Sequence, residues 1–319
     1  MLTGGHTKGL SPDAVQTAID AVLYERAERE AQPSYFGVRN GEFFRQSSID
    51  TYAFIYDEDS NVGAFNETGE QEVIKTENTF IGRQVTRNVV KWMKRIPVSH
   101  EAFRADQVGK RDRIGRQMGD RARLTQDKEG ILRTYGDAFD GNYFTTPDGE
   151  NLASNSHTAL KTGDTIDNLE TGALTPDTLW NTFVSLQTQL GQDGELAGYT
   201  ASAVATNTTQ YKTLKEILNS ELIANSAENN LNIFETDYGM VAIAQSPFLN
   251  SAADLGTNKA TAVHVVSDGH EVHRMVFSDL NSDLIEPRYS ETDSWEYRSR
   301  FEEVSFPGTF QGYAGLTGA

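Results

Sequence analysis

The sequence predicts a mixed α+β fold, because helical and strand-like patterns both occur along the chain without regular alternation. Apolar residues at helical spacing dominate the first and middle parts, whereas alternating apolar residues occupy the last third. The chain has 319 residues, of which 37% are hydrophobic, and a chain of this length buries roughly 75% of its unfolded surface. It contains no cysteine, which excludes disulfides, thiol nucleophiles and thiolate metal sites.

The first helix is predicted to begin after Ser11, whose hydroxyl can cap a first turn containing Pro12 and Asp13. The apolar residues of this helix follow at helical spacing, and they are Val15, Ile19, Val22 and Leu23. The helical pattern ends near Gln32-Pro33. A segment rich in turn residues and aromatic side chains comes next.

Residues 49–56 and 79–90 each have the pattern of a strand, and together they predict a two-stranded ribbon. The segment between them is strongly acidic and has almost no apolar residues besides Val62, Ala64 and Phe65. A lone two-stranded ribbon cannot bury a core of its own. We therefore expect the ribbon to lean on another surface.

A long helix is predicted over residues 106–139. Apolar residues are spaced by four at Ile114, Met118 and Ala122, and again at residues 131, 135 and 139. Gly115 and Gly119 lie in the same stretch, and each costs about 1 kcal/mol relative to alanine in a helix. These glycines indicate either close contact with another backbone or a bend.

The second half of the chain begins with a predicted loop over residues 137–157. A helix is expected to start at Thr175-Pro176-Asp177, and Thr208 or Thr209 is expected to cap another. Strands are predicted over residues 231–244, 262–267 and 271–277, with Asp268-Gly269 as a hairpin turn between the last two. A final long strand carries the alternating residues Trp295, Tyr297 and Phe301.

The charge of the chain is unevenly distributed. The net charge is -18, and a uniformly acidic surface repels phosphate backbones. A protein that binds along a nucleic-acid duplex is therefore excluded, unless its basic residues are concentrated on one part of its surface. Residues 83–133 hold 14 of the 28 Lys and Arg residues and only 6 acidic residues. This stretch indicates either a solvated helix face or a surface that faces nucleic acid.

No sequence pattern predicts an active site. Glycine-rich phosphate loops and the nucleophile elbow are absent. Three side-chain groups fail on spacing or orientation for metal binding or catalysis: His264 with His270 and His273, Ser156 with His157, and Asp57-Glu58-Asp59. The histidines would lie on different faces of a strand, so they cannot share a metal ion. Ser156 and His157 are adjacent in sequence, and side chains of adjacent residues rarely face each other. The three acids lack the glycine and the terminal glutamate of an EF-hand loop. We expect no catalytic residue, no cofactor and no metal site.

No segment predicts membrane insertion. The most apolar stretch, residues 241–249, is interrupted by Gln245, Ser246 and Pro247. It is far shorter than the ~20 apolar residues that a membrane helix needs. The N-terminus has no apolar run after a basic start, so no secretion signal is predicted. We expect a soluble protein with no membrane partner.

The order of these elements resembles the major capsid proteins of tailed bacteriophages with the Hong Kong 97 fold, in particular the group similar to the Mu-like major head subunit. An N-terminal helix precedes an acidic ribbon and a long helix. Residues 148–157, from Asp148-Gly149 to His157, are similar to a segment of that group, with Ala153 where phenylalanine is usual. Further similar segments are residues 206–221, 229–232, 248–249 and 306–313, so the resemblance spans about residues 11–313.

The resemblance implies five parts: an N-terminal arm over residues 1–48, an E-loop ribbon with flanking strands over 49–97, a peripheral domain with a spine helix over 98–172, an axial domain over 173–284 and return strands to the peripheral domain over 285–319. It implies a structural protein of the virion, assembled in the host cytoplasm, whose pentamers and hexamers enclose double-stranded DNA. The implied partners are further copies of this chain, the packaged DNA, a portal, and decoration or scaffolding proteins.

The resemblance also implies two sets of functional residues. The ribbon residues expected at a contact with a neighbouring copy are Asp57, Glu58, Asp59, Phe65, Glu67, Glu70 and Glu72. The spine-helix residues expected to face DNA are Arg111, Arg113, Arg116, Arg121 and Arg123. Because these arginines spread around the helix, only some can face DNA, and others are expected to pair with acids such as Asp112 and Asp120.

Two other functions stay open from the sequence. An encapsulin-like nanocompartment shell would have a similar fold and would store an enzyme cargo in place of a genome. The more distant alternative is a hydrolase with an acidic surface, using Asp57, Asp59 or Glu101. Such an enzyme needs two carboxylates about 5–10 Å apart in a pocket, and no spacing in the sequence predicts such a pair.

Overall fold

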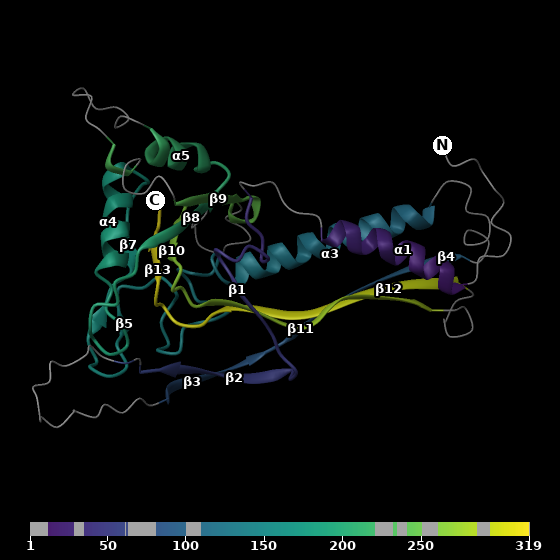
Figure 1. Ribbon diagram of the computed structural model, residues 1–319, viewed down its shortest axis with the longest axis horizontal. Helices are drawn as coiled ribbons and strands as arrows, with labels where there is room; N and C mark the ends of the chain where they lie inside the picture. Colours follow the sequence, from purple (N-terminus) through teal and green to yellow (C-terminus); the bar gives the residue numbers. More distant parts are fainter. Residues whose placement is uncertain are drawn as a thin grey trace, which may run out of the picture. The chain divides into compact units, whose positions relative to one another are not determined.

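The computed structural model describes residues 12–28, 35–60, 62, 81–99, 110–220, 232–234, 241–250, 261–285 and 294–318. The chain forms two compact units. The first unit comprises residues 1–30, 89–127 and 276–303, and the second comprises residues 31–88, 128–275 and 304–319. Helices and strands occur together in both units, which confirms the predicted α+β class (Figure 1). Within the described ranges, no helix is long and apolar enough to span a membrane.

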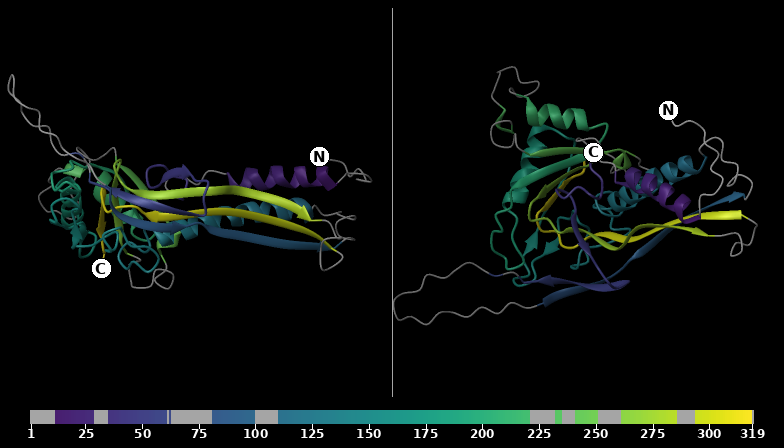
Figure 2. Two further views of the ribbon diagram at one scale, coloured as in Figure 1. Left: turned by 90° about the horizontal axis from the view of Figure 1, so that it is seen from below. Right: turned by 45° about the vertical axis from the view of Figure 1, so that its right-hand side comes forward.

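The first unit packs two helices on strands. Helix α1 (Pro12–Ala27) runs beside α3 (Lys110–Arg133), as Figures 1 and 2 both show. Strand β4 (Val90–Ser99) pairs antiparallel with β12 (Ser294–Pro307), and β11 (Val272–Ile285) borders β12 on its other side. The core between these elements is apolar; it contains Ile19, Leu23, Ala27, Val98, Ile114, Met118, Ala122, Leu280, Tyr297 and Phe301.

The two helix glycines lie where α1 touches α3. A Cβ atom added to Gly119 would lie 2.3 Å from the carbonyl oxygen of Leu23, and one added to Gly115 would lie 2.7 Å from Cγ2 of Ile19. Both distances are shorter than real Cβ contacts allow. Of the two predicted explanations for these glycines, close backbone contact is therefore the one that the structure supports.

The second unit is built on a five-stranded sheet in the order β7-β13-β10-β8-β9. Its strands are β7 (Leu169–Glu170), β8 (Ala201–Asn207), β9 (Ala242–Ser246), β10 (Val263–Ser267) and β13 (Tyr313–Leu316). Helices α4 (Pro176–Gln187) and α5 (Tyr211–Asn219) pack on this sheet through an apolar cluster that includes Phe183 and Leu214. A short hairpin of β5 (His157–Thr158) and β6 (Thr165–Ile166) belongs to the same unit.

The predicted ribbon is present in the second unit. Strands β2 (Ala53–Asp59) and β3 (Ile81–Asn88) pair antiparallel with each other and with no other strand among the residues described. The first strand begins four residues later than predicted, and β1 (Arg45–Ser48), which was not predicted, precedes it and borders β11. Of the predicted acidic tip, only residues 57–60 and 62 lie within the described residues.

The predicted helix over residues 106–139 is too long, because α3 ends at Arg133 and residues 134–140 form turns. Three further local predictions are wrong. Asp268-Gly269 does not close a hairpin, because β10 pairs with β8 and β13 whereas β11 belongs to a different sheet. The cap of α5 is neither threonine; Gln210 occupies the N-cap, and its backbone N–H donates to Oδ1 of Asn207 at 2.6 Å. Within the predicted strand 231–244, residues 233 and 234 are helical and the strand begins at Ala242. Strand pairing between distant segments decides the first of these three, whereas the cap of α5 is decided locally by Asn207, three residues before Gln210.

Candidate functional site

The exposed face of α3 carries the positive charge that the sequence segregates. Arg113, Arg116 and Arg121 are exposed and Arg123 is half-buried, whereas Ile114, Met118 and Ala122 are buried on the opposite face. The side chain of Arg111 lies outside the described residues. Four of the five predicted arginines are therefore placed, and three of them reach solvent.

These three exposed arginines form no ion pair with any described residue. The expected pairing of such arginines with Asp120 is not formed, and the side chain of Asp112 lies outside the described part of the chain. At the far end of the helix, by contrast, Nε of Arg133 lies 3.2 Å from a carboxylate oxygen of Glu129. The middle of α3 thus presents cations that are available to an external anion.

The basic residues of β4 are arranged differently. Nζ of Lys91 lies 3.6 Å from Glu302, and Nη1 of Arg95 lies 3.3 Å from Glu296. Both carboxylates belong to β12 and are buried. These lysine and arginine charges are therefore largely neutralised within the sheet, and sequence reasoning, which counted them with the α3 arginines, could not separate the two groups.

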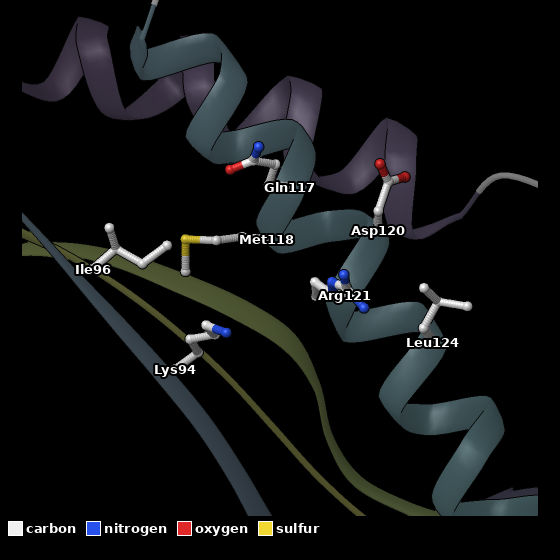
Figure 3. Close-up of a pocket in the computed structure, with 7 residues that line it drawn as sticks. All are labelled: Lys94, Ile96, Gln117, Met118, Asp120, Arg121 and Leu124. Atoms are coloured by element: carbon white, nitrogen blue, oxygen red, sulfur yellow. The ribbon is translucent and has the colours of Figure 1, made fainter.

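A groove of about 560 Å³ lies beside α3 in the first unit. Figure 3 shows Lys94 and Ile96 on the β4 side and the other lining residues on α3. Those other residues are Gln117, Met118, Asp120, Arg121 and Leu124. Its lining combines apolar side chains with two cations and one carboxylate, and it includes no hydroxyl, thiol or imidazole side chain.

The base of the ribbon forms the second candidate site. The side chains of Asp57 and Asp59 are exposed, but that of Glu58 is buried with 1% of its surface accessible. Arg83 and Gln192 of the same chain both hydrogen-bond the Glu58 carboxylate. Glu58 therefore departs from the expectation that it contacts a neighbouring copy, because both carboxylate oxygens are engaged within its own unit. The carboxylates of Asp57, Glu58 and Asp59 do not point towards a common site, because the middle one is buried and the other two are exposed.

The remaining predicted ribbon residues are Phe65, Glu67, Glu70 and Glu72, and they lie outside the described residues. A second contact of the ribbon was not predicted at all. The hydroxyl of Tyr56 donates to Glu271 at 2.9 Å, and Arg45 and His273 lie 3.3 and 2.9 Å from the same carboxylate. The aromatic alternation of Phe54 and Tyr56 was the sequence signal for this inward ribbon face.

The loop over residues 148–157 is closed by a buried Asp–His pair. Nδ1 of His157 lies 2.8 Å from a carboxylate oxygen of Asp148, and Nε2 lies 3.3 Å from the Leu152 carbonyl oxygen. Burial alone would raise the pKa of Asp148, but the hydrogen bond from His157 and the charge of that ring lower it to about 2. The His157 ring also stacks on Phe310 with centroids 4.3 Å apart.

The rings of His157 and His264 are both engaged in buried contacts of the fold. Both ring nitrogens of His157 are occupied, so the ring is not available as a base for Ser156. His264 is buried, its Nδ1 lies 2.8 Å from the Tyr313 hydroxyl, and burial lowers its pKa to about 3. Among the described residues, no group of three or more potential ligands is placed to hold a metal ion.

The comparisons with known proteins point to one family. The model of the family described as phage capsid protein matches residues 83–312, which is more than half of the chain. No curated protein sequence matches. The chain is similar to the capsid structure of the cyanophage P-SCSP1u, with a TM-score of 0.56 and 12% identity over 91% of this chain and 90% of that one.

Two further solved structures are similar over nearly their whole length. The capsid of Myoviridae phage XM1 has a TM-score of 0.51 and 14% identity, covering 92% of this chain and 95% of that one. A virus-like particle from Pyrococcus furiosus has a TM-score of 0.51 and 10% identity, covering 94% of this chain and 98% of that one. At such identities the similarity shows the fold, which is the predicted Hong Kong 97 fold.

Proposed function

This chain belongs to the phage capsid protein family, and we propose that its copies assemble as pentamers and hexamers into an icosahedral head around double-stranded DNA. It is a structural protein of the virion and not an enzyme. The observation that carries the proposal is the exposed face of α3, where Arg113, Arg116 and Arg121 have no ion-pair partner among the described residues. In a chain of net charge -18, such a face is suited to bind a polyanion without sequence preference.

The outward side of the ribbon supports a contact with a neighbouring copy. Ile55 on β2 and Ile81 on β3 are 60% and 58% exposed. Large apolar side chains gathered on one exposed element mark an interaction surface. Asp57 and Asp59 share the outward face, and we place them in the intersubunit contact with Phe65, Glu67, Glu70 and Glu72.

The same proposal extends to the capsid subgroup, the parts of the subunit and the further partners. We assign the chain to the group similar to the Mu-like major head subunit, on the order of its elements and on residues 148–157. The five parts implied by that resemblance are retained, with an arm, a ribbon, a peripheral domain, an axial domain and return strands. A portal and decoration or scaffolding proteins are the further partners.

The purified protein is expected to form closed polyhedral particles. Interfaces in such a shell should bury well over the roughly 1,600 Å² of a standard complex, so assembly should be visible by electron microscopy and light scattering. A stable 35.3 kDa monomer at every concentration and ionic strength would refute assembly. Nucleic acid recovered from purified native particles distinguishes a head from a nanocompartment, whose shells would hold a protein cargo.

Neutralising the exposed arginines is expected to weaken DNA binding without preventing shell assembly. Each lost phosphate contact should reduce the slope of log K against log salt by about 0.9, so R113Q/R116Q should reduce it by up to about 2. Exposed side chains away from structural contacts contribute roughly 0.5 kcal/mol or less to stability. The measurements are DNA affinity of dissociated subunits across a salt series and electron microscopy of empty shells.

The control for this experiment is K212Q/K215Q, which removes the same charge from two exposed residues of α5. Its salt slope should match that of the unmodified protein. Folded R113Q/R116Q subunits that cannot form shells would show that these arginines contact a neighbouring subunit and not DNA.

A further inference from the structure

The inward face of the ribbon base carries a buried acid. Phe54, Tyr56 and Glu58 alternate along β2, so they share one face of the ribbon. Nη1 of Arg83, on the opposite ribbon strand, lies 3.3 Å from Oε2 of Glu58. The side-chain amide of Gln192, which is itself 1% exposed, donates to Oε1.

The partners of Glu58 are themselves fixed to the body of the second unit. Oε1 of Gln192 accepts a hydrogen bond from the Leu160 N–H at 2.9 Å, and the Lys161 N–H donates to the Gln192 carbonyl oxygen at 2.9 Å. Arg83 also donates to the carbonyl oxygen of Thr158 at 3.0 Å. Both strands of the ribbon are therefore tied to the segment that carries β5 and β6.

The Leu160 side chain packs against the backbone of β3. A Cβ atom added to Gly82 would lie 2.1 Å from Cδ2 of Leu160, so the end of that side chain fills the space beside Gly82 and would have to move for a larger residue. Contact between Gly82 and Leu160 thus adds apolar packing to the polar contacts of Glu58, Arg83 and Gln192.

We propose that Glu58, Arg83 and Gln192 form a latch that holds the base of the ribbon on its own subunit and thereby sets the direction in which the ribbon reaches a neighbouring copy. The proposal rests on the proposed function for the neighbouring copy, and Glu58 acts in it as a positioning residue. A ribbon released at its base could leave the subunit in several directions, and shells built from such subunits should vary in curvature.

The protonation of Glu58 should control the strength of this latch. Burial raises the pKa of Glu58 to about 7, with the attraction of Arg83 acting against the shift and the charge of Asp148 adding to it. Tyr56, on the same strand, is the other titratable group that interacts with Glu58, and Gln192 is neutral. In a released ribbon the solvated carboxyl returns towards its ordinary, lower pKa. Release is therefore favoured as the pH rises through 7.

Amide hydrogen exchange on dissociated subunits tests the latch. E58A leaves the Gln192 amide and the Arg83 guanidinium without their acceptor, and the protection of backbone amides in residues 81–86 should fall by about tenfold or more. E58Q keeps the size of the side chain, but its amide turns an NH2 group towards a donor, because both Glu58 oxygens accept hydrogen bonds. It should therefore retain only part of the protection and lose the additional opening above pH 7. The matched control is D50N, which changes an exposed acid three residues before β2 and should behave as the unmodified protein.

Electron microscopy of assembled particles provides the second readout. E58A should give a broader distribution of particle sizes and more open shells than D50N, and E58Q should give a distribution between the two. The latch is refuted if E58A and E58Q both match D50N in amide protection, in its pH dependence and in particle shape. If the unmodified protein forms no particles, the proposed function fails, while the exchange experiment on subunits still decides the latch.

Discussion

Substituting alanine for His157 is expected to lower the free energy of unfolding by about 3–5 kcal/mol, because it leaves the buried carboxylate of Asp148 without its main partner. The side chains of both residues are almost fully inaccessible, at 0% for His157 and 2% for Asp148. The substitution also removes the ring that stacks on Phe310. Urea or thermal unfolding of dissociated subunits gives the measurement.

H273A is the matched control for this substitution. His273 contacts Glu271 at 2.9 Å, but 26% of the Glu271 side chain is accessible, and Tyr56 and Arg45 still contact that carboxylate when the ring is removed. H273A should therefore cost clearly less stability than H157A. Equal losses in the two variants would contradict a special role for the buried pair.

The same pair predicts a pH dependence. The folded-state pKa of Asp148 is about 2, below its ordinary value of 3.8, so its ionised form favours folding at every pH above about 4. This contribution, about 2 kcal/mol, should be lost as the pH falls from 4 to 2. The difference in unfolding free energy between the unmodified protein and D148N should shrink over that interval, and a difference that stays constant would refute the assignment.

Alanine at Gly119 is expected to lower the free energy of unfolding by about 1–3 kcal/mol, because its Cβ would overlap the Leu23 carbonyl oxygen across the α1–α3 contact. Helix propensity alone predicts the opposite sign, since alanine favours a helix by about 1 kcal/mol over glycine. The sign of the measured change therefore shows which effect dominates. The measurement is again equilibrium unfolding of subunits.

The control for this contact is G41A. Gly41 has ordinary backbone angles and no atom within 4 Å of an added Cβ, so its replacement should change stability by roughly 0.5 kcal/mol or less. If G119A is as stable as G41A or more stable, then the two helices do not pack as closely in solution as the structure places them.

The sequence predicted the ribbon but not how it is held. Its strands were predictable because alternation along residues 53–59 and 81–88 has the period of a strand. The same alternation places Glu58 on the face opposite Asp57, yet the fate of that carboxylate depends on Gln192, which lies 134 residues later. Pattern reasoning therefore grouped three adjacent acids that the fold separates into one buried and two exposed side chains.

The turn at Asp268-Gly269 illustrates the same limit. Its residues favour a hairpin locally, but a hairpin also requires the flanking strands to be each other's best partners. Strand β10 pairs instead with β8 and β13, from residues 201–206 and 313–316. Which strands pair depends on the apolar faces that the whole chain can bury together. The ten or so residues around a turn therefore do not predict the partners of its flanking strands.

Local sequence determined the α+β class, the long helix with its buried stripe, and the concentration of positive charge in residues 83–133, because periodicity and composition are properties of neighbouring residues. Tertiary structure alone decided which of those charges remain available. Lys91 and Arg95 meet buried carboxylates of β12, about 200 residues away in the chain, whereas Arg113 and Arg116 project from a helix face that no described acid approaches. A charge is free or neutralised according to its neighbours in space, and only folding brings those neighbours together.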